Sequence, residues 1–354
     1  MNISPIVLDP KYSTTSKLIQ KPPKLQEQSS SKIKSTLFLP KNDKRFWEGG
    51  LRKKGYFKYS YNTNNFRNQE KNIQNFIPSL GKSKIIPLVT IITVVFNGEK
   101  HIEKTIKSVI NQTYDNIEYI IIDGNSTDNT PLIIQKYEEL IDYWFSEPDG
   151  GIYEAMNKGI QLATGDLIGI INCGDFYPRE AISKVIELYL ENLQSDNYLI
   201  ISGAMIRFNE KRDIKFKTTK TLEQFKKNIH KKMEINHPST FIEAKVYKDL
   251  GKFNSNFRIC ADYELIFRAY YSEVVQFIFT NDVLANMLLG GISETFIGFL
   301  LRCKERFLIR KQKVGFINNI ILSGIWITNN LIKLTIKKIC YKNILKKYYK
   351  IKHR

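Results

Sequence analysis

Short apolar runs and helical repeats of apolar residues alternate along the central part of the chain. The runs LVTIITVV at 88–95 and EYIII at 118–122 are rich in β-branched residues and predict buried strands. Between them, apolar side chains recur at helical spacing over residues 99–112. A strand, a helix and a second strand at this spacing form a βαβ unit, in which the two strands are parallel and the crossover is right-handed.

The same alternation continues beyond this unit. Further strands are predicted at 143–146, 167–171 and 198–202, and further helices at 130–141, 152–163, 178–191, 221–233 and 261–271. Strands that alternate with helices are typical of an α/β fold. The sequence therefore predicts one α/β domain over residues 85–295, built around a mostly parallel central sheet.

Polar residues follow the first four predicted strands at the point where each strand ends. They are Asn97, Asp123, Asp149 and Asp175. Ligands bind beyond the carboxyl ends of the strands in an open parallel sheet. We therefore expect these four side chains to converge on one ligand site.

Two features near this edge have both a structural and a functional interpretation. Asp123 could form a turn or cap a helix, but Asp128 is better placed to cap the following helix, which leaves Asp123 for a ligand. The glycine pair 150–151 is either a simple turn or a helix N-terminus whose free N–H groups face the site. Lys158 is either a surface charge or a phosphate ligand.

The segments on either side of this domain differ from it in composition. Residues 1–84 are rich in Lys, Ser, Asn and Gln and are predicted to be a largely flexible basic segment. Within them, aromatic residues flank a Gly-Gly pair at 45–60, which predicts an arm that docks on the main domain. Residues 296–354 contain 15 basic residues and a single acid, Glu305, and are predicted to form a basic, amphipathic helical tail.

The net charge indicates the chemical class of the partner, and the cysteine pattern indicates the redox state of the compartment. The chain has 54 Lys and Arg against 35 Asp and Glu, a net charge of +19, so we expect an anionic partner such as phosphate esters, nucleic acid or an anionic membrane face. Its 4 cysteines lack CxxC spacing, which argues against a zinc site or a disulfide framework and fits a reducing compartment. The sequence shows neither a signal-peptide pattern nor a run of roughly 18 apolar residues that would span a bilayer.

Four segments stand in an informative order: TIITVVFNGEKHIEKTIKSVINQTY, YIIIDGNSTDNT, SEPDGGIYEAMNKGIQLATGD and INCGD. In this order and spacing they resemble the nucleotide-sugar-binding half of family 2 inverting glycosyltransferases. The later segments NHPSTFI, ADYELIFR and GGIS resemble the acceptor-side half of the bacterial polysaccharide-assembly branch of that family. The resemblance covers residues 87–293 and implies a GT-A type nucleotide-sugar-binding fold.

The resemblance also implies roles on the donor side. The nucleoside and donor would be bound by Thr93, Phe96, Asn97, Asp123, Asp149, Asn157 and Lys158. Asn172 to Asp175 match the motif that holds a divalent cation, Mg²⁺ or Mn²⁺, at the diphosphate, but only Asp175 is a carboxylate where the family often has several. Mg²⁺ takes one or two protein carboxylates and completes its shell with waters and phosphate oxygens, so one carboxylate is sufficient. Asp149 and Asp166 rank lower as assisting ligands.

On the acceptor side, the resemblance implies that Asp262, in ADYEL, is the catalytic base. Inverting transfer needs one base, because the acceptor hydroxyl loses its proton during a single displacement. The alternative role for Asp262 is a helix N-cap, and Glu264 is the second candidate for the base. His237, which precedes Pro238, is either structural or lies near the diphosphate or the acceptor.

Together these features predict a cytoplasmic glycosyltransferase that moves a sugar from a nucleotide-sugar donor to a glycan or lipid-linked acceptor, for surface polysaccharide assembly. Residues 315–332 carry no charge but include four asparagines, and basic clusters flank them. This pattern predicts a helix in peripheral contact with an anionic membrane, at the inner face of the plasma membrane. A helical pair packed on the catalytic domain is the alternative.

A nucleic-acid-binding protein is the alternative function, because a tail rich in Lys, Tyr and Phe suits phosphate contacts and base stacking. Carboxylates that converge on one edge would repel phosphates unless a metal lies between them, so we expect no nucleic-acid partner. No GxGxxG follows the first strand, which argues against a dinucleotide-dependent oxidoreductase.

Overall fold

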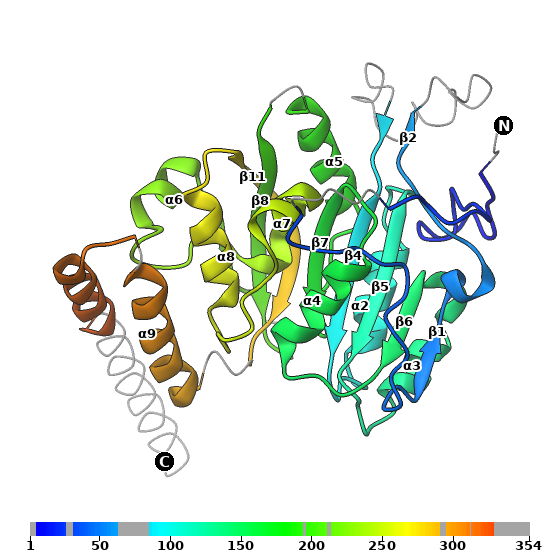
Figure 1. Ribbon diagram of the computed structural model, residues 1–354, viewed down its shortest axis with the longest axis horizontal. Coiled ribbons are helices and arrows are strands. Elements are labelled where there is room, and N and C mark those ends of the chain that lie inside the picture. The colour runs from blue at the N-terminus through cyan, green and yellow to red at the C-terminus, as the bar shows by residue number, and fades with distance from the viewer. Residues whose placement is uncertain are drawn as a thin grey trace, which may run out of the picture.

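The computed structural model describes residues 5–25, 31–62, 85–193, 196–210, 214–290, 295–311 and 313–328 (Figure 1). The strands are β1 (Trp47–Gly49), β2 (Tyr61–Asn62), β3 (Ile85–Ile86), β4 (Val89–Val95), β5 (Ile117–Asp123), β6 (Tyr143–Ser146), β7 (Leu167–Asn172), β8 (Tyr198–Phe208), β9 (Ile214–Thr218), β10 (Thr240–Glu243) and β11 (Val275–Leu288). The α-helices are α2 (Ile102–Ile110), α3 (Thr130–Gln135), α4 (Ile152–Leu162), α5 (Ala181–Glu191), α6 (Leu222–Asn228), α7 (Ala244–Leu250), α8 (Ala261–Tyr270), α9 (Phe296–Lys311) and a helix over residues 316–328. Short 3₁₀ helices are η1 (Leu51–Lys54), η4 (Glu138–Leu140) and η5 (His237–Ser239).

Among the described residues, a 9-stranded sheet has the order β1-β6-β5-β4-β7-β10-β8-β11, with β9 paired to β8. β4 is parallel to β5 and β7, and β5 is parallel to β6, as the predicted βαβ units require. β8 is parallel to β11, whereas β10 lies antiparallel between β7 and β8. The predicted α/β fold with a mostly parallel sheet is confirmed. β11, which is parallel to β8, and the antiparallel strands β1, β9 and β10 were not predicted from the sequence.

Helices cover both faces of this sheet (Figure 1). One core cluster joins α4 and α8 to one face and includes Met156, Ile160 and Leu265. The other joins α2 and α5 to the opposite face and includes Ile106 and Val185. Because both faces are covered, every residue of β4 and β5 is buried, which explains their continuous apolar runs.

The N-terminal segment packs against the sheet. β1 pairs antiparallel with β6, so the arm predicted at 45–60 contacts the domain through a strand. Residues 5–25, expected to be flexible, also pack on the domain: Leu18 is fully buried, and the Ser13 N–H donates to the carbonyl of Ile110 at 2.9 Å. Residues 31–44 also contact the domain: Ile33 is buried, and the N–H of Lys32 donates to the carbonyl of Lys248 at 2.7 Å. Residues 1–4, 26–30 and 63–84 of the predicted flexible segment lie outside the described residues.

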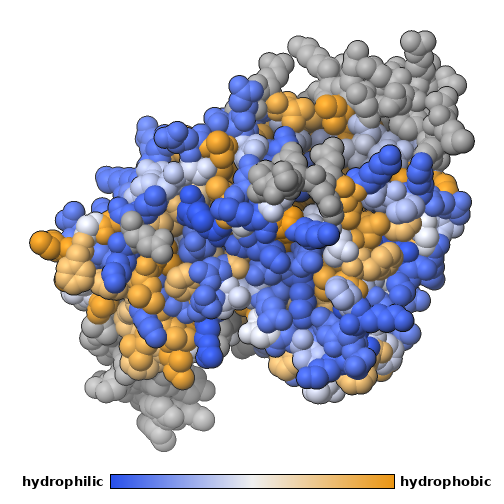
Figure 2. Space-filling view, in the orientation of Figure 1, coloured by the Kyte–Doolittle hydropathy of each residue, from blue (hydrophilic) through white to orange (hydrophobic). Residues whose placement is uncertain are grey.

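The C-terminal tail begins with α9, which contacts α8, and continues in the helix over residues 316–328 (Figure 1). Within the described ranges, no helix is both long enough and apolar enough to cross a membrane. Large apolar side chains are nevertheless exposed on both tail helices, and Figure 2 shows an orange area over this part of the surface. They are Phe296, Ile297, Leu300, Leu308, Phe316, Ile317, Ile320, Ile321 and Ile325.

Candidate active site

The carboxyl ends of β4, β5, β6 and β7 meet at one edge of the sheet (Figure 1). Asp123, at the end of β5, is fully buried and accepts hydrogen bonds from the N–H of Ser126 at 2.9 Å and from the hydroxyls of Ser126 and Ser146. It ties the ends of β5 and β6 together. Its expected contact with a nucleoside stays a prediction.

Gly124 allows the loop after β6 to approach β5. A Cβ at this position would meet Asp149 Oδ2 at 2.8 Å, so a larger residue would displace the Asp149 side chain. Asp149 itself is partly buried, and its Oδ1 accepts from the N–H of Gly151 at 2.8 Å. Burial raises the pKa of Asp149, against the effect of this hydrogen bond. Asp149 therefore lies at the ligand edge, where the sequence predicts it.

The turn after β4 presents an exposed aromatic ring. Asn97 has a φ of 49°, a left-handed conformation that Asn tolerates, and its Oδ1 accepts from the N–H of Thr127 at 2.9 Å. The preceding Phe96 is 66% exposed and lies beside Gly124. An exposed ring at the ligand edge of the sheet is suited to stacking on a planar base.

Two of the expected donor-binding residues are engaged inside the protein. Thr93 is fully buried, and its hydroxyl lies 3.0 Å from that of Tyr119. Asn157 uses both ends of its amide on Phe253, donating to the carbonyl at 2.8 Å and accepting from the N–H at 3.0 Å. Thr93 therefore has a core position and Asn157 joins α4 to the loop after α7. A motif match identifies the residue but not the direction of its side chain.

Charged residues hold the loop after β6 from two sides. Glu147 is buried, and its two carboxylate oxygens each lie 2.9 Å from a cation, Oε1 from Lys158 Nζ and Oε2 from Arg45 Nη2. Burial raises the pKa of Glu147, but the hydrogen bonds and charges of Lys158 and Arg45 outweigh it, so the pKa is lowered overall. Lys158, expected at a phosphate, is thus paired with Glu147. Sequence reasoning missed Arg45, and only its place in the aromatic arm signalled a contact with the domain.

The turn after β7 carries the expected metal ligand. Asp175 is 4% exposed, its Oδ1 accepts from the N–H of Leu288 at 2.8 Å, and burial raises its pKa to about 7. Asn172 Nδ2 lies 2.9 Å from His237 Nε2, which leaves Asn172 Oδ1 buried and without a hydrogen-bond partner. In the part of the chain that the structure describes, no three His, Cys, Asp or Glu side chains gather as metal ligands. The turn fits a cation that takes most of its ligands from substrate and water.

Asp166, an expected assistant to the metal, is not part of this turn. It precedes β7 instead of following it, and its carboxylate accepts from the N–H of Leu88 at 2.8 Å and from the hydroxyl of Ser60. The length of β7 separates it from Asp175, so the structure removes Asp166 from the predicted metal site.

Asp262 and His237 come together on the acceptor side of the same edge. Asp262 is the second residue of α8, and its Oδ1 lies 3.2 Å from the hydroxyl of Tyr153 and accepts from the N–H of Tyr263 at 2.7 Å. Its Oδ2 lies 4.0 Å from His237 Nδ1. Burial lowers the pKa of His237, and the charge of Asp262 opposes this shift. His237 thus connects Asp262 to the turn at Asn172.

The structure also bears on the two alternatives on α8, namely Glu264 as the base and Asp262 as the helix N-cap. Glu264, the second candidate for the base, forms an ion pair with Arg268 at 2.9 Å, so its carboxylate is engaged along the helix. The N-cap of α8 is Cys260, not Asp262. A small cavity of about 20 Å³, lined mainly by apolar side chains, lies beside Asp262 and His237.

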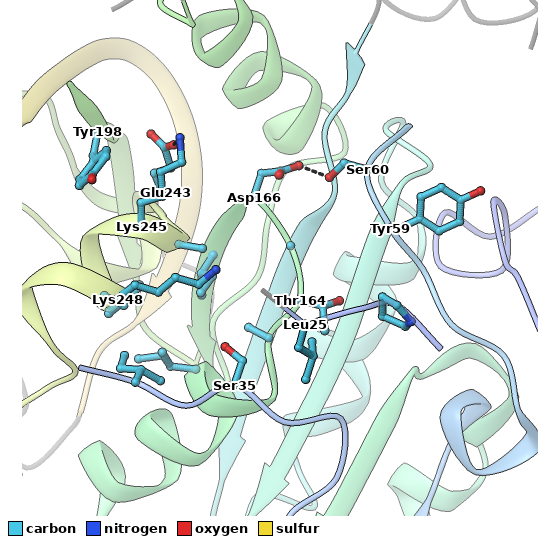
Figure 3. Close-up of a pocket in the computed structure, with 18 of the residues that line it drawn as sticks. Leu25, Ser35, Tyr59, Ser60, Thr164, Asp166, Tyr198, Glu243, Lys245 and Lys248 are labelled. Atoms are coloured by element: carbon cyan, nitrogen blue, oxygen red, sulfur yellow. Dashed lines mark hydrogen bonds and ion pairs between the residues drawn. The ribbon is translucent and has the colours of Figure 1, made fainter. Parts of the chain in front are cut away.

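A larger cavity of about 500 Å³ lies at the opposite edge of the sheet, beyond the amino ends of β4 and β7 (Figure 3). Asp166, Glu243 and Lys248 line it. The Asp166 and Glu243 carboxylates already accept hydrogen bonds from the protein, Glu243 from the N–H of Leu199 at 3.0 Å. None of the described residues expected in donor binding or catalysis lines this cavity. We therefore place the candidate site at the carboxyl edge.

Comparison with known proteins finds matches among glycosyltransferases. The family model described as glycosyl transferase family 2 matches residues 90–251. An uncharacterized glycosyltransferase of Mycobacterium tuberculosis (strain H37Rv) is 33% identical over 187 residues, which cover 52% of this chain and 69% of that protein. The putative teichuronic acid biosynthesis glycosyltransferase TuaG of Bacillus subtilis is 33% identical over 108 residues, or 30% of this chain and 43% of TuaG. The crystal structure of S. aureus TarS 1–349 in complex with UDP matches with a TM-score of 0.50 and 14% identity, covering 68% of this chain and 70% of that chain, a likeness of fold.

Proposed function

The chain belongs to glycosyl transferase family 2 and has the α/β fold of GT-A glycosyltransferases, and from this premise we propose that it transfers a sugar from a nucleotide-sugar donor to a glycan or lipid-linked acceptor with inversion. The observation that carries the proposal is the position of Asp262. Its carboxylate lies at the edge where β4 to β7 end, within 4.0 Å of His237, which contacts the turn after β7. Similarity to TuaG supports a role in surface polysaccharide assembly.

The two oxygens of Asp262 have different surroundings, which suits a general base. Oδ1 accepts a hydrogen bond from the N–H of Tyr263 and lies 3.2 Å from the Tyr153 hydroxyl, and these contacts fix the orientation of the carboxylate. Oδ2 is then the oxygen that receives the proton of the acceptor hydroxyl as the new C–O bond forms. The bond from the anomeric carbon to the nucleoside diphosphate breaks in the same step, and its electron pair leaves with the diphosphate.

On the donor side, Phe96 offers an exposed face on which the base of a nucleotide would stack. Asn172 Oδ1, which has no hydrogen-bond partner, and the Asp175 carboxylate are the protein oxygens that would hold Mg²⁺ or Mn²⁺. Such a cation neutralises the charge that develops on a departing diphosphate. The UDP in the TarS structure of similar fold supports a nucleotide donor.

The tail supports a peripheral membrane contact at the inner face of the plasma membrane. Ile317 is 73% exposed and Ile297 68% exposed, and basic residues such as Lys311 and Lys313 lie close in sequence. A helix with exposed apolar side chains and nearby positive charge binds anionic interfaces. We expect the protein to sediment with vesicles of anionic phospholipid and not with neutral vesicles. Equal binding to both, or to neither, contradicts this contact.

The function is tested by incubating the full chain with a panel of UDP-, GDP- and dTDP-sugars, with Mg²⁺ or Mn²⁺, and measuring the release of free nucleoside diphosphate. We expect release from one donor class, accelerated by an acceptor extract of glycans or polyprenyl-linked sugars. The absence of turnover with every donor, together with salt-sensitive retention of DNA or RNA, would instead favour the nucleic-acid-binding alternative.

A further inference from the structure

Residues 296–354 contain 15 basic residues and one acidic residue, Glu305, which is buried. Glu305, on α9, is 5% exposed. Its carboxylate accepts three backbone hydrogen bonds, from the N–H of Arg258 at 2.8 Å, of Ile259 at 3.1 Å and of Cys260 at 2.9 Å. One side chain of the tail therefore accepts all three backbone N–H groups of a short segment of the main domain.

This segment immediately precedes α8, and its last residue, Cys260, is the N-cap of that helix. Asp262 follows two residues later. On its other side the segment is held by Tyr153 of α4, whose hydroxyl donates to the carbonyl of Ile259 at 2.8 Å and lies 3.2 Å from Asp262 Oδ1. Glu305 and Tyr153 thus fix the backbone from which Asp262 projects, one from the tail and one from the donor-side helix.

The contact has a clear physical basis. The N–H of Cys260, at the N-cap of α8, has no acceptor within the helix, and the helix dipole favours a negative charge there. The N–H groups of Arg258 and Ile259 precede the helix and also need an acceptor. A buried carboxylate in turn needs several donors to offset its loss of water. The Glu305 carboxylate supplies the acceptor that these N–H groups need, and the N–H groups supply the donors that the buried carboxylate needs. Loss of the carboxylate would leave three N–H groups of residues 258–260 without their acceptor.

We propose that Glu305 is a positioning residue for Asp262, and that α9 therefore contributes to the transferase site. Asp262 lies two residues beyond the backbone segment that Glu305 holds, and both Asp262 and Glu305 lie outside the family-matched residues 90–251. The inference rests on the proposed function, in which Asp262 is the base. It predicts that a change at Glu305 affects the chemical step and not the binding of the donor, which involves the opposite side of the edge.

The test uses the full chain with Glu305→Gln, the shorter but charged Glu305→Asp, and Lys304→Ala as the matched control. Lys304 is the exposed neighbour of Glu305 on α9. Two quantities are measured: the hydrogen exchange of the amides at 258–260, and kcat and donor KM with the donor found in the nucleotide-sugar panel. We expect Glu305→Gln to exchange at least about tenfold faster there and to lower kcat between about tenfold and 100-fold, with donor KM within about twofold of wild type. Glu305→Asp should recover part of kcat, and Lys304→Ala should match the wild type.

Unchanged amide exchange in Glu305→Gln overturns the inference, as does faster exchange with unchanged kcat. A loss expressed only in donor KM also overturns it. If the wild type turns over no nucleotide sugar, the proposed function has failed. The exchange at 258–260 then still decides whether Glu305 holds this segment, because that measurement needs no substrate.

Discussion

Arg52 Nη2 lies 2.5 Å from Glu118 Oε1, and both side chains are buried. Arg52 belongs to the N-terminal arm, whereas Glu118 is the second residue of the central strand β5. Arg52 also donates to the carbonyl of Leu162 at 3.0 Å, and Glu118 accepts from the N–H of Thr164 at 2.8 Å. A charge inside the sheet is thus neutralised by a residue that lies outside the family-matched part of the chain.

Replacing Arg52 should therefore destabilise the whole domain. We expect Arg52→Met to lower the free energy of unfolding by about 3–5 kcal/mol, because removing one partner leaves a buried, unpaired charge. Urea denaturation followed by circular dichroism measures the change. Lys53→Ala, at a neighbouring exposed ion pair, should change it by less than about 1 kcal/mol. If both substitutions lower the free energy of unfolding by the same amount, the buried Arg52–Glu118 pair contributes no more to stability than the exposed pair.

Asp262→Asn should abolish sugar transfer while keeping nucleotide binding, because the amide cannot accept the proton of the acceptor hydroxyl. We expect kcat to fall by at least about 100-fold. Glu264→Gln is the matched control on the same helix and should keep kcat within about tenfold, because Glu264 is paired with Arg268. Nucleotide affinity is measured by calorimetry alongside turnover. Full activity of Asp262→Asn means that another group is the base.

Removal of divalent cations with EDTA should stop donor turnover, and Mn²⁺ or Mg²⁺ should restore it. Asp175→Ala should raise the cation concentration needed for half-maximal activity by about tenfold or more, because the turn supplies few other ligands. Asp166→Asn, at the opposite edge of the sheet, should leave this concentration unchanged. The proposed metal role of Asp175 fails if the dependence on cation concentration is the same in Asp175→Ala and wild type.

Arg45→Ala should weaken donor binding. Its guanidinium is one of two cations on Glu147, and the same loop carries Asp149 at the ligand edge. We expect donor KM to rise about three- to tenfold with kcat changed less than threefold, because the loss concerns the position of the loop and not the base. Lys44→Ala, an exposed neighbour, is the control. A fall in kcat at constant donor KM would contradict this role.

Stability should depend on pH through Asp166. Burial raises the pKa of Asp166, against the hydrogen bonds from Ser60 and Leu88. The folded protein therefore keeps this proton to a higher pH than the unfolded chain, in which Asp has a pKa of about 3.9. Between these two pKa values the wild type loses stability as pH rises. Asp166→Asn cannot titrate, so its free energy of unfolding relative to the wild type should increase with pH over that interval.

Urea denaturation from pH 4 to 8 measures this difference. The exposed Asp43→Asn should show no comparable trend relative to the wild type. A relative stability of Asp166→Asn that falls with rising pH would mean that the hydrogen bonds from Ser60 and Leu88 dominate over burial.

The central sheet could be predicted because its signal is local. The runs at 88–95 and 143–146 match β4 and β6 within a residue, since strands buried on both faces read as continuous apolar segments. β10 was not predicted: its four residues, TFIE, have only two apolar residues between two polar ones, and its place between β7 and β8 depends on distant partners. β11 was not predicted either, because its residues are mostly half-buried and polar residues interrupt its apolar ones. Local pattern therefore shows the strands at the centre of the sheet but not all of those beyond β7.

The same limit applies to the site. The edge positions of Asp149 and Asp175 follow from the strands that precede them. Arg45 could not be assigned, because its contact with Glu147 joins residues 102 positions apart. Glu305 was visible only as the single acid of a basic tail, and its contact with Cys260 spans 45 positions. A motif match does not reveal side chains that reach the site from residues outside the motif.

β1 has a consequence for how the protein behaves at high concentration. By pairing with β6 it occupies a sheet edge that would otherwise present free N–H and C=O groups to other molecules. A chain trimmed to residues 90–251 would keep the β6 strand but lose this cover. Such a fragment would be prone to self-association through strand addition. The arm thus covers one edge of the sheet, and the sheet extends beyond the family-matched residues.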